Sequence, residues 1–109
     1  MIRLGEKNER KQIMEDNADA FIIVPGGIGT FEEFFEILTL KQLNRHNKPI
    51  VIFNIDGFYD AMIKMLDEAI AGCFINVECK TMYPAFEQAE DVLNYIENYK
   101  KQDLTKMKR

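Results

Sequence analysis

The stretch that decides the fold reads Ala20-Phe21-Ile22-Ile23-Val24-Pro25-Gly26-Gly27-Ile28-Gly29-Thr30-Phe31-Glu32-Glu33. Residues 20–24 form a short, continuous apolar run with β-branched side chains, which is typical of a strand buried on both faces of a parallel sheet. Pro25 and a glycine-rich turn end this strand. We predict that the next helix begins at Thr30, because large apolar side chains then recur at helical spacing, at Phe31, Phe34, Phe35 and Leu38.

The same alternation of strands and helices continues along the chain. Residues 49–54 are almost wholly apolar and predict a second strand, which ends before a turn at Asp56-Gly57. Residues 59–70 show one apolar helical face, and Gly72 stands where a glycine often ends a helix. A weaker strand is predicted near residues 80–83. A last helix follows, with one apolar side formed by Phe86, Ala89, Val92, Leu93 and Ile96.

This order of elements predicts an α/β fold. Residues 5–17 are polar and lack proline, so they predict an exposed helix, and residues 100–109 predict a solvated tail. Strands that are buried on both faces and alternate with helices favour a parallel sheet with right-handed crossovers and helices on both faces. About three strands can be counted, and no linker or repeat divides the chain, so we expect one domain over residues 1–109.

Composition narrows the class of protein. The chain has 109 residues, of which 47% are hydrophobic and 29% are charged, as in a soluble globular domain. Its formal net charge of −4 gives no general attraction to nucleic acid or to anionic membranes. Cys73 and Cys79 are too few for a disulfide framework, and we recognise no signal peptide or membrane-spanning run. We therefore expect a cytoplasmic protein with free thiols and without nucleic-acid or membrane partners.

The turn at residues 26–30 can bind phosphate. Glycine allows positive φ angles and close approach of a ligand to the backbone, while the free N–H groups and the dipole of the helix start attract an anion. The turn is not a dinucleotide fingerprint, because Glu32 occupies the place of the third glycine, and no Gly-Lys-Ser/Thr of a P-loop follows. Purely structural turns use the same residue types, so the pattern alone leaves both interpretations open.

Glu33 also has two interpretations. The spacing from Thr30 to Glu33 fits a capping box, in which each side chain bonds the other residue's backbone N–H. Alternatively, the carboxylate lies beside a bound phosphosugar and steadies an oxocarbenium-like centre or orients water. This second role needs a nearby cation to offset repulsion between the glutamates and the phosphate. Arg10-Lys11 would supply it, although a basic pair on a solvated helix is the commoner outcome.

Three other features have simpler interpretations. His46, the only histidine, lies in a polar turn and predicts a surface position, since a single histidine without clustered ligands does not make a metal site. Asp60 is expected to cap the helix that follows it. The aromatic stripe Phe31, Phe34 and Phe35 is expected to lie partly in the core and partly against a partner chain.

Taken together, these residues resemble a known family. Arg10-Lys11, followed by the P-G-G-x-G-T-x-x-E motif at residues 25–33, resembles the signature of the LOG proteins, the cytokinin riboside 5′-monophosphate phosphoribohydrolases. Lys48-Pro49, Asn54 and residues 57–60 are similar to a strand and turn of that family. The likeness runs from about residue 10 to residue 75, and more loosely to the last helix.

The resemblance implies a Rossmann-like fold and a homodimer. It also implies hydrolysis of a nucleoside 5′-monophosphate to ribose 5-phosphate and free base, adenine or an N6-modified adenine, without a metal or organic cofactor. By motif position, Arg10 and Glu33 would be catalytic. Substrate and phosphate contacts are implied for Lys11, Gly26, Gly27, Ile28, Gly29, Thr30, Glu32 and Thr39. A non-catalytic nucleotide-binding or regulatory module and an inactive fragment remain as alternatives.

Family members also carry the label of lysine decarboxylases. That chemistry needs an electron sink such as pyridoxal phosphate, bound through a lysine Schiff base. The sequence offers no argument for such a site, so we do not adopt the label.

The sequence departs from the family pattern in two places. The family has further strands, a glycine-containing loop and a substrate-contacting glutamate before the Arg-Lys helix, and Lys7 stands where the family often has methionine. We therefore expect residues 1–109 to correspond to the second half of the family's domain, as a fragment, a truncated product or one half of a split protein. The leading strand, residues 20–24, would then leave an open apolar sheet edge.

Overall fold

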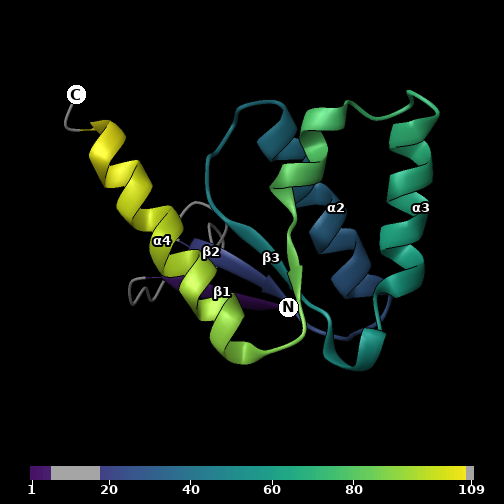
Figure 1. Cartoon of the computed structure of the whole chain (residues 1–109), viewed down its shortest axis with the longest axis horizontal. Coiled ribbons are helices and arrows are strands. Elements are labelled where there is room, and N and C mark those ends of the chain that lie inside the picture. Colours follow the sequence, from purple (N-terminus) through teal and green to yellow (C-terminus); the bar gives the residue numbers. More distant parts are fainter. Residues whose placement is uncertain (6–17, 108–109) are drawn as a thin grey trace.

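The computed structural model describes residues 1–5 and 18–107, whose centre is a four-stranded sheet with the strand order β1-β2-β3-β4 (Figure 1). The strands are β1 (Ile2–Gly5), β2 (Ala18–Ile23), β3 (Ile50–Phe53) and β4 (Ala85–Phe86). β2, β3 and β4 run parallel to one another, whereas β1 runs antiparallel to β2. The predicted parallel sheet is confirmed with β2 and β3 as two of its strands, β4 is its third strand at a later position than predicted, and an antiparallel strand is added at its edge.

The sequence pattern did not reveal β1. In its pairing with β2, Arg3 lies opposite Phe21 and Leu4 lies opposite Ala20. Its short alternation of apolar and charged residues suits an edge strand, but it is too brief to predict. β1 covers the edge of β2, so the expectation that β2 would leave an open edge was wrong. Gly5 ends β1 rather than beginning a helix, and residues 6–17 lie outside the described residues.

Helices cover both faces of the sheet, as predicted (Figure 1). α2 (Ile28–Gln42) and α3 (Asp60–Ala71) pack on one face, and α4 (Ala89–Met107) packs on the other. The core against α2 and α3 includes Phe21, Ile23, Phe34, Ile37, Ile50, Ile52 and Leu66. The core against α4 includes Ala20, Ile22, Val51, Val92 and Ile96.

The later part of the chain corrects two predictions. Residues 80–83, predicted as a weak strand, belong to the 3-10 helix η2 (Val77–Met82), and β4 follows it. The Asn76 side chain accepts a hydrogen bond from the Glu78 N–H at 3.0 Å and so starts this helix, which local alternation could not indicate. The predicted solvated tail is also helical as far as Met107, since no proline or glycine interrupts residues 89–107.

Gly72 ends α3 as predicted, but it does not take the left-handed conformation that glycine often takes at a helix end. The φ angle of Gly72 is −86°. The neighbouring Cys73 takes the left-handed conformation instead, with a φ of 68°. A Cβ on Gly72 would lie 3.2 Å from the ring of Phe74, so packing rather than backbone conformation favours glycine here. Cys73 is exposed and Cys79 is buried, and both are free thiols, as expected.

Tyr59 joins the two loops at the carboxyl ends of β2 and β3. Its side chain is buried, its hydroxyl donates to the Val24 carbonyl at 2.6 Å, and its N–H donates to the Asn54 side chain at 2.7 Å. Burial raises the pKa of Tyr59, so the hydroxyl stays protonated and remains a donor. Because Val24 directly precedes Pro25 and the glycine turn, this bond fixes the turn relative to the start of α3.

The tyrosine pair Tyr59 and Tyr83 gives a matched test of this bond. We expect Tyr59→Phe to lower the free energy of unfolding by about 1–2 kcal/mol, because it leaves the Val24 carbonyl without its donor. Tyr83 is equally buried, but its hydroxyl has no hydrogen-bond partner among the described residues. Tyr83→Phe should therefore be neutral or slightly stabilising. Denaturant unfolding measures both variants, and equal losses in the two would contradict this assignment.

His46 was expected at the surface but is half-buried between α2 and β3. The Lys48 N–H donates to its Nδ1 at 3.1 Å, so Nε2 carries the proton and donates to the Ile37 carbonyl at 2.9 Å. Burial, followed by the nearby charges of Lys41 and Lys48, lowers its pKa below the ordinary value of 6.5. The neutral ring therefore connects the end of α2 to the start of β3.

This pKa shift predicts a loss of stability in mild acid. A histidine with a lowered native pKa contributes fully above the unfolded pKa of 6.5, and the contribution is lost as the pH falls below it, because the unfolded chain takes up the proton first. We expect the free energy of unfolding to fall between about pH 6.5 and 5, and His46→Gln to flatten this slope. Unfolding curves across this range measure it, and an unchanged slope in the variant would refute the assignment.

Candidate active site

The glycine turn connects the end of β2 to the start of α2. Gly27 is the residue preceding the helix, and the first intrahelical bond runs from the Phe31 N–H to the Gly27 carbonyl at 3.1 Å. The N–H groups of residues 28–30 come before that bond, so they are not used within the helix. They lie at the carboxyl end of a parallel strand, where open α/β sheets bind ligands. The geometry is that of an anion site at a helix start.

The glycines of this turn are needed for space rather than for positive φ. Among the described glycines, only Gly57 has a positive φ, of 71°, so the turn does not use the positive φ angles that glycine allows. A Cβ on Gly26 would lie 2.3 Å from the Thr30 hydroxyl oxygen, which excludes any larger residue unless Thr30 moves. Gly27 and Gly29 have open space where a Cβ would be, so a ligand can approach the backbone there.

The capping box predicted from Thr30 to Glu33 does not form. α2 begins at Ile28 rather than at Thr30, and no side chain caps it. Thr30 lies inside the first turn, where its hydroxyl faces Gly26. The glycine turn allows the helix to start two residues earlier, so the Thr30-to-Glu33 spacing no longer matches the ends of a cap. Glu33 is therefore available for another partner.

That partner is Arg3 of β1. The Arg3 Nη2 donates to the Glu33 Oε2 at 2.5 Å, and the side chains are 18% and 39% exposed, respectively. Sequence reasoning missed Arg3, because a pair separated by 30 positions depends on strand pairing and not on local spacing. The alternation Ile2-Arg3-Leu4 was the only signal that could have indicated it.

Only some of the other predicted site residues lie near the glycine turn. Ile28 and Glu32 are exposed near the glycine turn. Thr39 is also exposed, but it lies about 13 Å further along the helix from Thr30, and its hydroxyl donates to the Phe35 carbonyl at 2.7 Å. The structure does not bring Thr39 to the turn. Arg10 and Lys11 fall outside the described residues, so their contribution stays a prediction.

The loop after β3 supports the site from its neighbouring strand. Asn54 is buried, and its amide donates to the Asp60 carboxylate at 2.8 Å. Asp60 does not cap α3 as expected, because Tyr59 precedes the helix and Asp60 is its first residue. A Cβ on Gly57 would lie 2.6 Å from this carboxylate, which adds to its positive φ as a reason for glycine. The turn expected at residues 56 and 57 is a short 3-10 helix, η1 (Ile55–Gly57).

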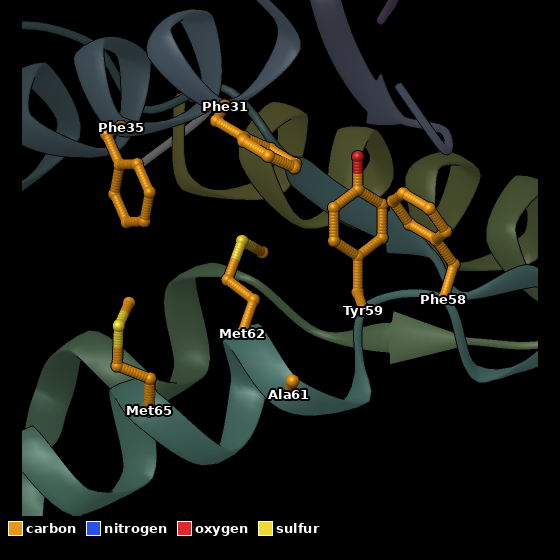
Figure 2. Close-up of a pocket in the computed structure, with 7 residues that line it drawn as sticks. All are labelled: Phe31, Phe35, Phe58, Tyr59, Ala61, Met62 and Met65. Atoms are coloured by element: carbon orange, nitrogen blue, oxygen red, sulfur yellow. The ribbon is translucent and has the colours of Figure 1, made fainter. Parts of the chain in front are cut away.

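An apolar groove lies on the opposite flank of α2. Figure 2 shows Phe35 of α2 and Met62 and Met65 of α3 pointing into the space between the two helices, with Phe31 turned toward Tyr59. The cavity there has a volume of about 390 Å³. The remaining lining residues are Phe58, Tyr59 and Ala61. Phe34 is fully buried, whereas Phe31 and Phe35 are half-buried, so the aromatic stripe is divided between the core and this groove. With its apolar lining, the groove does not suit a phosphate.

No cluster of three or more His, Cys, Asp or Glu side chains among the described residues is placed to hold a metal ion. Within residues 1–5 and 18–107, no helix has both the length and the apolar character needed to cross a membrane.

Comparison with known proteins places these features in a family. Residues 1–96 match the model of a family described as possible lysine decarboxylases. Over 99 residues the chain is 37% identical to the cytokinin riboside 5′-monophosphate phosphoribohydrolase LOG2 of Arabidopsis thaliana, covering 91% of this chain and 46% of that protein. It is also 38% identical over 96 residues to the probable cytokinin riboside 5′-monophosphate phosphoribohydrolase LOGL1 of Oryza sativa subsp. japonica, covering 88% and 43%.

The chain thus spans less than half of the length of either relative. Within that span, the family model covers both the glycine turn and Glu33 with its partner Arg3. The chain belongs to the LOG family, the group that this family model describes as possible lysine decarboxylases.

Proposed function

We propose that this chain carries the phosphate-binding and catalytic part of a nucleoside 5′-monophosphate phosphoribohydrolase. The reaction would hydrolyse the N-glycosidic bond and release ribose 5-phosphate and a free base, adenine or an N6-modified adenine. The observation that carries this proposal is the unused N–H groups at the start of α2, one helical turn before the Glu33 carboxylate. The names of the LOG2 and LOGL1 relatives support this class of reaction, and cytokinin activation would be its biological outcome.

In this proposal each part of the turn has a role. The backbone of residues 26–30 binds the 5′-phosphate, because Gly27 and Gly29 leave space for it beside the helix start. Glu33 steadies positive charge on the ribose or activates water, as carboxylates do at oxocarbenium-like centres. Arg10 orients the substrate, while Lys11 and Glu32 complete the substrate contacts; Thr39, about 13 Å along α2 from Thr30, takes no part at the turn. Residues 1–109 act as one domain.

Lysine decarboxylation does not fit the residues near this site. That chemistry requires an electron sink held through a lysine Schiff base. Lys41 is the buried lysine of the described residues, and it lies in the last turn of α2, far from the glycine turn. Its ammonium donates to the Lys48 carbonyl at 2.7 Å and to the Tyr99 hydroxyl at 3.1 Å. These contacts hold the end of α2, so a hydrolase is the better proposal.

The activity is tested with AMP and with N6-isopentenyladenosine 5′-monophosphate as substrates. We expect the wild-type chain to release free base, detected by chromatography, and Glu33→Gln to lower the rate at least about 100-fold, because the amide cannot act as a carboxylate. Glu36→Gln is the matched control, since Glu36 is exposed on the same helix one turn later. It should retain the wild-type rate.

Two outcomes would decide against catalysis. Nucleotide binding without base release, from folded protein, would favour a non-catalytic nucleotide-binding or regulatory module. Neither binding nor release would favour an inactive fragment. Equal losses in Glu33→Gln and Glu36→Gln would remove the catalytic role of Glu33.

We also propose that the chain forms a homodimer in the cytoplasm, without nucleic-acid or membrane partners. The groove between α2 and α3 supports the dimer, because Phe58 and Met65 are 49% and 54% exposed beside it. Ile28 is 79% exposed and shares the flank of α2 that carries Phe31 and Phe35. A stable dimer buries about 800 Å² on each partner, so the groove would be the centre of a larger contact.

The dimer is tested with one charged substitution in the groove and one outside it. Met65→Lys should raise the dimer dissociation constant about tenfold or more, because it places a charge in the centre of the apolar contact. Leu93→Lys is the control, since Leu93 is 52% exposed but lies on α4, across the sheet. Analytical ultracentrifugation measures both. A monomeric wild-type chain, or equal effects of the two substitutions, would contradict the proposed interface.

A further inference from the structure

Strand pairing directs Arg3 toward α2. β1 and β2 are antiparallel, and Arg3 lies directly opposite Phe21. Directly opposed residues of an antiparallel pair project from the same face of the sheet. Phe21 belongs to the core against α2, so Arg3 projects toward that helix as well. The edge strand therefore carries a guanidinium group to the flank of α2 that bears Glu33.

The resulting ion pair is partly shielded from solvent. The Arg3 side chain is 18% exposed, and it meets Glu33 through a single charge-assisted hydrogen bond. Salt and water screen such a pair less than a more exposed one, such as Lys80–Asp67, whose side chains are about half-exposed. Glu33 is thereby held in one orientation.

Stability alone does not account for this pair. Apolar residues of similar volume often replace a buried ion pair without loss of stability. Arg3 also buries its Nε without a hydrogen-bond partner among the described residues, which adds a desolvation cost. The pair fixes the position of the Glu33 carboxylate, which an apolar contact would not do.

The direction of the Glu33 side chain connects the pair to the glycine turn. Side chains on a helix lean toward its N-terminus, so Glu33 leans toward Gly29 and Thr30. A phosphate bound at this turn and an uncompensated carboxylate would repel each other. The Arg3 guanidinium offsets the carboxylate charge, so both anions can be present at the start of α2.

We propose that Arg3 is a positioning residue of the site, which holds the Glu33 carboxylate toward the glycine turn and balances its charge against the substrate phosphate. This inference rests on the proposed phosphoribohydrolase function. Arg3 acts through Glu33, so its contribution must disappear when the Glu33 carboxylate is removed.

A double-mutant cycle in kcat tests this dependence. Arg3→Gln should lower kcat roughly 10- to 100-fold, as expected for a displaced catalytic group. In the Glu33→Gln background, Arg3→Gln should cause no further loss. Arg3→Lys keeps the charge but not the planar fork, so it should recover only part of kcat. If Arg3→Gln lowered kcat equally in both backgrounds, or did not lower it in the wild-type background, the inference would be overturned while the proposed function stayed intact.

A binding measurement decides the inference without turnover. Calorimetry with ribose 5-phosphate should show affinity reduced about tenfold in Arg3→Gln. Affinity should return to within about threefold of wild type in the Arg3→Gln/Glu33→Gln double variant and in Arg3→Lys. This pattern supports charge balance even if base release fails and the proposed function falls. Unchanged affinity in Arg3→Gln would overturn charge balance.

Lys80→Gln serves as the control, because it breaks an exposed ion pair outside the site and should retain wild-type kcat and affinity. Circular dichroism and thermal unfolding establish that each variant is folded, and Arg3→Met replaces Arg3→Gln if the latter is not. Wild-type protein that neither releases base nor binds ribose 5-phosphate would overturn both the inference and the proposed function.

Discussion

Burial of β2 on both faces is the constraint on which the rest of the structure depends. Phe21 and Ile23 pack against α2 and α3, while Ala20 packs against α4, and all three are almost completely buried. Each large apolar side chain contributes roughly 1.5–3 kcal/mol when it leaves water. This burial fixes where the chain leaves the sheet, and Tyr59 then fixes the turn beside β3 through the Val24 carbonyl. The position of the glycine turn follows from these contacts.

Sequence patterns predicted the elements that bury a continuous apolar surface. β2, β3 and the three described α-helices each show such a surface, because burial selects residue types at a regular period. β4 is only two residues long, and β1 lacks the continuous apolar run that made β3, of equal length, recognisable. The last turns of α4 were missed for a different reason: an exposed helix end carries no apolar pattern, so only the lack of helix breakers could indicate it.

The site was predictable where residue type alone determines the chemistry. The residue types of 26–30 allowed either an anion-binding turn or a purely structural one; the structure puts unused N–H groups there, and anion binding stays a prediction. The predicted capping box at Thr30 was wrong, because the glycine turn lets α2 begin at Ile28, two residues before Thr30. Arg3 was missed because its contact with Glu33 depends on the register of an antiparallel pair. The roles of Arg10 and Lys11, which lie outside the described residues, remain predictions.

α2 separates two kinds of surface by its rotation of about 100° per residue. Glu33 follows Phe31 by two residues, so the charged flank and the apolar groove lie about half a turn apart. A change in the groove can therefore leave Glu33 in place. A change at the sheet edge does affect Glu33, because any movement of β1 moves Arg3 and with it the Glu33 carboxylate. β1 is paired with β2 alone at the edge of the sheet, so its attachment to β2 is part of what holds the candidate site together.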